Sequence, residues 1–403
     1  MVDERGMRVL VAMDSFKGSL TSLQAGNALA EGLRRSHVEP PVSKRPWTVT
    51  VVPISDGGEG TLAALKGLGE QTEVEVVNAF GEPHTTTILM LESGSALIES
   101  ALVLGLHQVG VVDETVVERT SSYGLGLAIK EAMRLGAGRV LVTLGGSATT
   151  DGGTGMLLAL GGRARDADGR EIAWKPGRNP LLGAPTHAEL PELSVDLEAL
   201  VDVNNPLTGS RGAAAVFGPQ KGLTPTQVRK VDALMAAGGW ALDSAWGLDV
   251  SSTPGSGAAG GIGAGLMSLG ATIRPGFAAI ADLVGLERHL QRADLVITGE
   301  GRIDSQTLGG KAPMGVAEAA SGFGVPTIAV GGSVDLPEDA ETPFAAVFSI
   351  LRKVGPCGGG GTAGPGPLAE AMRPDVARRN LTDLGASLRG VFEAAWEIGR
   401  KLS

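Results

Sequence analysis

The fold of this chain is predicted by Asp294-Leu-Val-Ile-Thr-Gly-Glu-Gly-Arg-Ile-Asp-Ser-Gln-Thr-Leu-Gly-Gly-Lys-Ala-Pro313. The stretch opens with Leu295-Val-Ile297, a short apolar run that is typical of a strand covered on both faces of a sheet. Glycines at positions 299 and 301 then flank Glu300. Because glycine frees the backbone, we expect the strand to stop here and to leave Glu300 on a sharp bend.

Three charged residues follow these glycines: Arg302, Asp304 and Lys311. A strand end, a glycine bend and a group of charges are typical of the carboxyl edge of an α/β sheet, where ligands bind. Each charge taken alone is equally typical of a solvated loop. Three further turns of the same design occur elsewhere in the chain, so we interpret the whole group as part of a ligand site.

Length and composition set the class of protein. The chain has 403 residues, which is long for one hydrophobic core, so two domains are expected. Its 34 basic and 44 acidic residues give a net charge of −10, which argues against nonspecific binding to nucleic acid or to an anionic membrane. Cys357 is the only cysteine, which excludes an intrachain disulfide and a thiolate metal cluster.

Targeting signals are not evident in the sequence. The first residues carry no signal-peptide apolar region, and no apolar run reaches the length that a membrane span needs. We therefore expect a cytoplasmic protein. A homo-oligomer is compatible with this composition.

Both ends of the chain have a βα pattern. We expect strands at 8–13, 48–52, 294–298, 327–330 and 346–350, and helices at about 20–33, 313–321 and 375–401. Strands joined through helices run parallel. The sequence pattern differs between these two ends, with short strands expected at 72–77, 85–91 and 96–100 that suggest an antiparallel region. Further elements are expected there, with helices at 121–136, 154–160, 225–246 and 258–269, strands at 139–144 and 197–203, and a hairpin turn at Asp168-Gly169.

This alternation predicts an α/β fold with two domains. A Rossmann-like parallel-sheet domain is formed by two chain segments, residues 1–70 plus 285–403. A second, mixed α/β domain is inserted between them and comprises residues 71–284.

Four turns of the discontinuous domain share one design: Asp14-Ser-Phe-Lys17, Asp56-Gly-Gly-Glu59, Glu300-Gly-Arg302 and Gly331-Gly-Ser333. Since the carboxyl ends of parallel strands lie at one edge of a sheet, we expect these turns to meet. Two glycine-rich turns of the inserted domain, at 145–153 and 202–207, are expected to face them across a cleft.

The residue types at these turns suit phosphoryl transfer. Carboxylates hold Mg²⁺, which usually reaches a site together with phosphates. Glycine turns and helix N-termini bind phosphate through their N–H groups. Lysine offsets the charge that develops during transfer, and a carboxylate can accept a hydroxyl proton. A small hydroxylated molecule is the acceptor that such a site predicts.

Several competing signals are weak. Gly255-Ser-Gly-Ala-Ala-Gly260 matches the dinucleotide-binding glycine pattern but does not follow a buried strand. The Gly310-Lys311 pair lacks the first glycine of a phosphate-binding Walker loop, and Gly145-Gly-Ser-Ala-Thr149 lacks the last glycine of a nucleophile elbow. All five histidines lie outside the glycine turns, so neither a zinc site nor a Ser-His-Asp triad is expected.

The motif series resembles that of the bacterial class I glycerate kinases. The matching segments are Asp14-Ser-Phe-Lys-Gly-Ser, Ser55-Asp-Gly-Gly-Glu-Gly-Thr, Gly145-Gly-Ser-Ala-Thr-Thr-Asp-Gly-Gly, Asp202-Val-Asn-Asn-Pro-Leu, Phe217-Gly-Pro-Gln-Lys-Gly and Thr298-Gly-Glu-Gly-Arg-Ile-Asp-Ser-Gln-Thr. They run in order over nearly the whole chain. The resemblance implies two α/β domains and phosphorylation of D-glycerate with ATP and Mg²⁺. It favours 2-phosphoglycerate as the product and leaves 3-phosphoglycerate open.

Three features depart from the family pattern. Thr150 stands where the family usually has Asn, which puts a polar role of this position in doubt. Val201 replaces a small residue or Cys before Asp202, and the glycine-rich loop at 355–366 looks like an insertion.

Residues in these motifs receive candidate roles. Lys17 stabilises charge and Asp202 accepts the proton, with Asp151 as the rival base. The candidates for contact with ATP and its phosphates are Ser15, Gly57, Gly58, Gly145, Gly146, Ser147 and Lys311. The candidates for contact with the acceptor acid are Asp14, Arg302, Asn204 and Lys221. The candidates for Mg²⁺ are Asp56, Glu300 and Asp304.

Structural alternatives exist for four of these residues. Lys17 could be a surface ammonium, and Asp202 a turn former that bonds its own backbone. Asp56 could be the N-cap of the helix that follows it. Arg302 could form a salt bridge to Asp304 or Glu300.

Two other functions remain as alternatives. The chain could phosphorylate another small hydroxy acid, or it could be a regulator that binds a small acid without turnover. Retention of Lys17, Asp56, Asp202, Glu300 and Lys311 together argues against the regulator, because so many carboxylates would repel an acidic ligand unless a cation were present.

Overall fold

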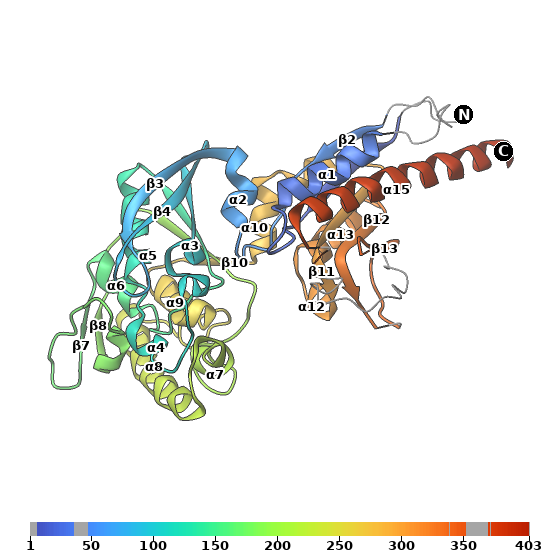
Figure 1. Cartoon of the computed structure of the whole chain (residues 1–403). Helices are drawn as coiled ribbons and strands as arrows, with labels where there is room; N and C mark the ends of the chain where they lie inside the picture. Colours follow the sequence, from blue (N-terminus) through green and yellow to red (C-terminus); the bar gives the residue numbers. More distant parts are fainter. Residues whose placement is uncertain (1–5, 36–46, 338, 352–369, 371, 403) are drawn as a thin grey trace. The chain divides into compact units, whose positions relative to one another are not determined.

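The computed structural model describes residues 6–35, 47–337, 339–351, 370 and 372–402 (Figure 1). Its contacts divide the chain into two compact units. Unit 1 comprises Met1–Asp56, Ala63–Leu65 and Ile280–Ser403, and unit 2 comprises Gly57–Leu62 and Lys66–Ala279. The glycine turn after Asp56 therefore belongs to unit 2. None of the helices in the described part of the chain is long and apolar enough to span a membrane.

Unit 1 is built on a parallel sheet of five strands in the order β13-β12-β11-β1-β2. The strands are β1 (Arg8–Met13), β2 (Thr48–Val51), β11 (Leu295–Asp304), β12 (Thr327–Asp335) and β13 (Ala346–Ser349). Every pairing in this sheet is parallel, as the βα pattern predicted. The carboxyl ends of its strands consequently lie at one edge.

The helices assigned wholly to unit 1 are α1 (Ser22–Arg34), α11 (Leu286–Leu290), α12 (Ser305–Leu308), α13 (Ala312–Gly322) and α15 (Pro374–Leu402). Thr21 starts α1 through a capping box with Gln24, because each side chain bonds the backbone N–H of the other. Helices α1 and α15 lie side by side (Figure 1). A Cβ atom at Gly32 would overlap the Thr382 carbonyl oxygen, so glycine permits this close approach.

The expected bend at Glu300 is wrong. Strand β11 continues through the glycines to Asp304, and β12 continues to Asp335 beside it. A Cβ atom at Gly299 would overlap the Val330 carbonyl oxygen, and one at Gly332 would overlap the Gly301 carbonyl oxygen. The glycines here serve close packing of two neighbouring strands, and Glu300 projects from a strand rather than from a turn.

Unit 2 contains a mixed sheet in the order β10-β9-β6-β5-β4-β3. Strands β3 (Gly69–Val77), β4 (Pro83–Leu91) and β5 (Ser95–Glu99) are antiparallel, as predicted. Strands β5, β6 (Arg139–Thr143), β9 (Asp196–Leu200) and β10 (Thr272–Arg274) run parallel. Two short strands, β7 (Arg163–Arg165) and β8 (His187–Glu189), form a separate pair. The predicted strand at 197–203 thus ends earlier, at Leu200.

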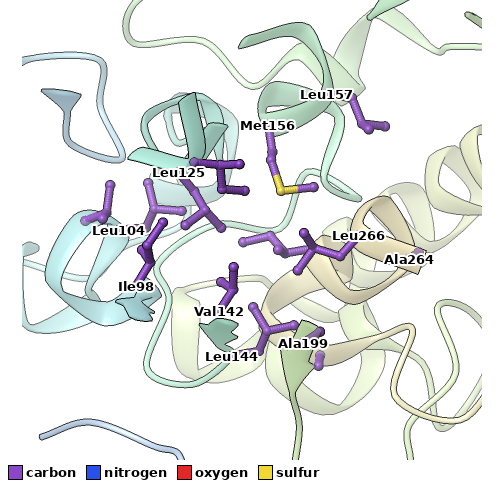
Figure 2. Close-up of a cluster of buried hydrophobic side chains, with 14 of the residues drawn as sticks. Ile98, Leu104, Leu125, Val142, Leu144, Met156, Leu157, Ala199, Ala264 and Leu266 are labelled. Carbon is purple, nitrogen blue, oxygen red and sulfur yellow. The ribbon is translucent and has the colours of Figure 1, made fainter. Parts of the chain in front are cut away.

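The longer helices of unit 2 are α5 (Tyr123–Arg134), α6 (Thr154–Leu160), α8 (Pro225–Trp246) and α9 (Ala258–Ser268). The shorter ones are α3 (Ser100–Leu104), α4 (Val116–Arg119) and α7 (Ala213–Phe217). Figure 2 shows the core that they form with the sheet, in which Ile98, Leu125, Val142, Met156 and Leu266 converge. Two helices, α2 (Thr61–Leu65) and α10 (Gly276–Leu283), have residues in both units.

The start of α9 differs from a regular helix. Ala259, Gly260 and Gly261 have left-handed backbone angles. A Cβ atom at Gly260 would overlap the Thr149 carbonyl oxygen, so the glycine-rich run at 255–260 allows this segment to pack on residues 149–153. This packing explains the glycines without a dinucleotide. The glycine-rich insertion predicted at 355–366 lies outside the described residues.

The predicted hairpin turn at Asp168-Gly169 is present. Gly169 has a φ of 78°, and Arg165 and Glu171 form an antiparallel bridge on either side of the turn.

Candidate active site

Unit 1 gathers three carboxylates at the carboxyl edge of its sheet, and we call Asp14, Asp56 and Glu300 the carboxylate cluster. Asp14 follows β1 directly, and its N–H donates to the Gly299 carbonyl oxygen over 2.8 Å. Asp56 follows β2, and Glu300 lies within β11. Asp14 and Glu300 are buried, with 5% and 7% of their surface exposed. The predicted convergence is confirmed for Asp14, Asp56 and Glu300, although Glu300 lies on a strand and not in a turn.

The three carboxylates of the cluster repel one another. Burial, followed by the charges of Asp56 and Glu300, raises the pKa of Asp14 to about 8. The Ser15 N–H, 2.6 Å from Asp14 Oδ1, and the Lys17 ammonium oppose this shift. A proton on Asp14 therefore relieves repulsion, and a bound cation would do the same.

Glu300 is held by two neighbours. The Thr307 hydroxyl donates to Oε1 over 2.6 Å, and Lys311 Nζ lies 3.8 Å from Oε2. Burial raises the pKa of Glu300, while these two neighbours lower it. Lys311 occupies the N-cap position of α13, so the start of this helix fixes the lysine near the cluster.

Asp304 and Arg302 make structural contacts. Asp304 accepts the N–H groups of Gln306 and Thr307 and so caps α12. Arg302 pairs with Asp304 over 3.3 Å and with Asp335 over 2.6 Å, and 60% of its side chain is exposed. Its predicted salt bridge to Asp304 is therefore present. Within the described ranges, no group of three His, Cys, Asp or Glu side chains is arranged to hold a metal ion.

The Phe16–Leu20 turn carries Lys17. Phe16 N–H donates to the Leu20 carbonyl oxygen over 2.8 Å, and Lys17 is exposed. A Cβ atom at Gly301 would lie 3.4 Å from the backbone nitrogen of Lys17, so β11 passes close to this turn. The N-cap alternative for Asp56 is wrong, because Gly60 occupies the N-cap position of α2.

The carboxyl edge of the parallel part of the unit 2 sheet brings glycine turns together. A Cβ atom at Gly57 would lie 2.8 Å from the Gly276 Cα atom, and one at Gly145 would lie 3.5 Å from the Gly58 Cα atom. Gly57 has a φ of 84°, which favours glycine. Three backbone segments that are distant in sequence thus touch without intervening side chains.

Glu99, which the sequence analysis did not single out, anchors the first of these turns. Its Oε1 accepts the Gly60 N–H over 2.8 Å, and its Oε2 accepts the Leu62 N–H over 2.9 Å. The side chain is buried, and burial raises its pKa although the two hydrogen bonds lower it. A carboxylate at the end of the apolar strand β5 was the sequence signal for this role.

Residues 145–153, which we call the glycine loop, form backbone hydrogen bonds along their length. The Gly146 carbonyl oxygen accepts the Leu106 N–H over 2.7 Å, and the Ala148 N–H donates to the Leu104 carbonyl oxygen over 2.7 Å. The Gly152 N–H donates to the Gly260 carbonyl oxygen over 3.0 Å. This bonding gives the loop a fixed backbone.

Two buried charges lie beneath the glycine loop. Asp151 accepts the N–H and hydroxyl of Ser122, at 2.7 and 2.9 Å, and two further N–H groups from Gly153 and Gly155. Lys221 Nζ donates to the Thr149 carbonyl oxygen over 2.6 Å and to Ser147 Oγ over 3.2 Å. Burial raises the pKa of Asp151 and lowers the pKa of Lys221 to about 7, a shift that Asp151 opposes.

Asp202 and Asn204 are exposed where the chain leaves β9. Asp202 Oδ1 accepts the N–H of Gly276 over 2.8 Å, so it lies beside the place where the glycine turns touch. The neighbouring Asn205 donates to the Arg211 carbonyl oxygen over 2.7 Å and shapes this turn. Among the predicted acids of unit 2, Asp202 is therefore accessible, whereas Asp151 is fully buried.

A parallel α/β sheet with charged groups at its carboxyl edge, and a second α/β unit with touching glycine turns, suit an enzyme of the phosphotransferase class. The chain belongs to the glycerate kinase family, whose family model matches residues 9–362. The resemblance drawn from the sequence motifs is thereby confirmed. Members of this class transfer a phosphoryl group to a hydroxyl acceptor.

Similar proteins cover almost the whole chain. The glycerate kinase of Bacillus subtilis is 38% identical over 393 residues, which are 95% of this chain and 98% of the relative. The glycerate 2-kinase of Escherichia coli is 36% identical and covers 87% of this chain and 92% of the relative. A crystal structure assigned to a glycerate kinase 2 of Salmonella typhimurium LT2 matches with a TM-score of 0.80 at 34% identity, over 98% of this chain and all of that one.

Proposed function

We propose that this protein transfers the γ-phosphoryl group of ATP to D-glycerate and forms 2-phosphoglycerate. The observation that carries the proposal is the contact of the glycine turns at Gly57, Gly58, Gly145 and Gly276 beside the accessible Asp202. Backbone N–H groups at glycine turns suit phosphate, and an accessible carboxylate suits a hydroxyl proton. The name of the Escherichia coli relative, a glycerate 2-kinase, supports the choice of product.

Phosphate contacts are assigned to backbone and short side chains. The residues are Ser15, Gly57, Gly58, Gly145, Gly146 and Ser147, with Lys311 as a charge partner. The fixed backbone of the glycine loop favours this role, because its N–H groups need no reorganisation when charge develops. Glu99 is a positioning residue, since it fixes the turn that contains Gly57 and Gly58.

Mg²⁺ is assigned to Asp56 and Glu300. This ion commonly binds through one or two carboxylates, phosphate oxygens and water, so it does not require three convergent side chains. Burial and the charges of Asp56 and Glu300 raise the pKa of Asp14, and a cation would relieve this repulsion, which supports the assignment. Asp304 already caps α12, and we assign it an outer position. When bound, the ion would neutralise charge on the phosphate oxygens.

Acceptor contacts are assigned to Asp14, Asn204, Arg302 and Lys221. Arg302 offers a planar donor fork that suits a carboxylate. Lys221 is buried beneath the glycine loop, so it acts on the acceptor through Ser147 and Thr149 rather than by direct contact.

The catalytic groups are assigned to Lys17 and Asp202. Asp202 is exposed and accepts the Gly276 N–H, so it can also receive a proton from the acceptor hydroxyl. Asp151 is fully buried with four donors, and this geometry favours a role in holding the glycine loop. Lys17 is an exposed ammonium at the edge that carries the carboxylate cluster, where it offsets negative charge.

The specificity of the proposal is tested by ADP release over a panel of hydroxy acids with ATP and Mg²⁺. We expect D-glycerate to give the highest kcat/KM. A higher kcat/KM for another small hydroxy acid would reject D-glycerate as the substrate while leaving the protein a kinase.

A further inference from the structure

A hollow with basic and hydroxyl side chains in its lining lies at the amino edge of the unit 1 sheet, at the opposite strand ends from the carboxylate cluster. It is lined by the starts of β1 and β2, by the end of α11 and by the segment that follows this helix, and its volume is about 280 Å³. The lining residues are Arg8, Val9, Leu10, Thr48, Thr50, His289, Arg292 and Ala293. A strand of six residues spans roughly 20 Å, which separates this hollow from the cluster.

The lining is cationic although the chain as a whole is acidic. It contains two arginines, a histidine and two threonines, and no carboxylate. Thr48 and Thr50 alternate with the core residue Val49 along β2, so their hydroxyls lie on the sheet face away from Val49. The hollow therefore offers hydrogen-bond donors and positive charge from three separate segments.

One arginine forms a fixed wall of the hollow. Asp294, just outside the lining, accepts the Arg8 backbone N–H over 2.8 Å and the guanidinium at Nε and Nη2 over 3.2 and 2.7 Å. This pairing orients Arg8 and neutralises its charge. The unbalanced positive charge comes from Arg292, which forms no ion pair with a described residue, and the His289 ring adds a nitrogen hydrogen-bonding group to the lining.

We infer that this hollow is a second, noncatalytic anion site that binds a phosphate group. Guanidinium groups and hydroxyls are the usual donors to phosphate oxygens, and charge-assisted bonds from Arg292 supply the strongest contact. A volume of about 280 Å³ is at the lower end of small-molecule sites, so the ligand is inorganic phosphate or a small phosphate ester rather than a nucleotide.

The test follows the ring signals of His289 by NMR in the full chain. The chain has only five histidines, so selective labelling gives a simple spectrum, and His289→Gln identifies the signal. Inorganic phosphate and methyl phosphate are titrated in parallel, with sodium chloride at matched ionic strength as the reference. Tighter binding of one compound identifies free phosphate or a phosphate ester as the ligand.

Arg292→Ala is the test variant, and Arg288→Ala is its matched control. Arg288 belongs to α11 and has the same charge, but it does not line the hollow. We expect a saturable shift of the His289 signal in the original chain and in Arg288→Ala, and at least a ~10-fold weaker affinity in Arg292→Ala, as for the loss of one charge-assisted contact.

Absence of a saturable shift, or an equal shift with chloride, would overturn the inference. Equal affinity in Arg292→Ala would do so as well. The readout does not depend on kinase activity, so it can fail or succeed independently of the proposed reaction.

Discussion

The accessible Asp202 and the buried Asp151 are the two candidates for the base that accepts the hydroxyl proton. Asp202 lies beside the touching glycine turns, whereas Asp151 accepts four hydrogen bonds inside unit 2. We expect Asp202→Asn to slow single-turnover phosphoryl transfer by at least ~100-fold at saturating ATP and glycerate, the lower range for loss of an acid–base group. Near-normal transfer in Asp202→Asn, together with an inactive but folded Asp151→Asn, would instead assign the base to Asp151.

The pKa of Asp14 predicts a pH dependence of stability. In the folded protein Asp14 keeps its proton up to about pH 8, whereas the ordinary value for an aspartate is 3.8. Between these values the folded state holds the extra proton, so the contribution of Asp14 to the free energy of unfolding falls as pH rises. We expect Asp14→Asn to remove this fall, so its stability relative to the original chain should grow from pH 4 to pH 8.

Urea unfolding at several pH values measures this difference. Comparison with the original chain at each pH cancels the titration of the other groups. A difference that stays constant between pH 4 and pH 8 would show that the pKa of Asp14 is not raised in the folded protein.

The turn that follows Asp56 depends on Glu99 at the scale of an element. Glu99→Gln retains one acceptor for the Gly60 and Leu62 N–H groups and places an amide donor against the other. Because Gly57 and Gly58 are proposed phosphate contacts, we expect KM for ATP to rise at least ~10-fold, as for the loss of one charged hydrogen bond. The exposed Glu75 on β3 provides the matched control, Glu75→Gln.

Separate measurements of KM and of folding distinguish a positioning role of Glu99 from a general effect on stability. Circular dichroism should show that Glu99→Gln remains folded, and KM for glycerate should change less than KM for ATP. Equal changes in both constants, or an unchanged KM for ATP, would contradict the proposed role of Glu99.

The close contact of β11 and β12 depends on Gly299. A Cβ atom at this position would overlap the Val330 carbonyl oxygen, which cannot move without breaking the sheet. We expect Gly299→Ala to lower the free energy of unfolding by about 3 kcal/mol, the upper range for overpacking. Gly322→Ala at the exposed end of α13, where a Cβ atom meets open space, should stay within about 0.5 kcal/mol of the original chain. Equal stability of the two variants would show that the strands adapt to the added methyl group.

The sequence predicted most of these elements because their periodicity is local. Strand β1, helix α8 and the antiparallel pairing of β3, β4 and β5 follow from apolar patterns and turn residues. The sequence did not predict that β11 passes straight through its glycines. Glycine permits both a bend and a close approach, and only the neighbouring strand decides between them.

The candidate residues likewise divide into those whose placement the sequence predicted and those whose roles depend on distant partners. Asp14, Asp56 and Glu300 were predicted to meet because parallel strands place their carboxyl ends at one edge. The roles of Glu99 and Lys221 could not be predicted, since they depend on partners that are 37 and more than 70 residues away. Thr150, where the family usually has Asn, has a buried hydroxyl with no hydrogen-bond partner in the described part of the chain.

At the scale of the whole molecule, two units contribute different chemistry to the proposed reaction. Unit 1 provides carboxylates and lysines at a parallel-sheet edge, and unit 2 provides glycine turns and Asp202. The match to the glycerate kinase family extends over both units, because the matched residues 9–362 include every proposed site residue.

Phosphorus NMR of the product formed from D-glycerate, ATP and Mg²⁺ tests the central claim most directly, because it reports transfer and its position together. We expect one new phosphate-ester signal, with the coupling pattern of a phosphate on the secondary hydroxyl of 2-phosphoglycerate. A signal from a phosphate on the primary hydroxyl would contradict the proposed product. Release of inorganic phosphate without any ester signal would contradict the proposed transfer to glycerate.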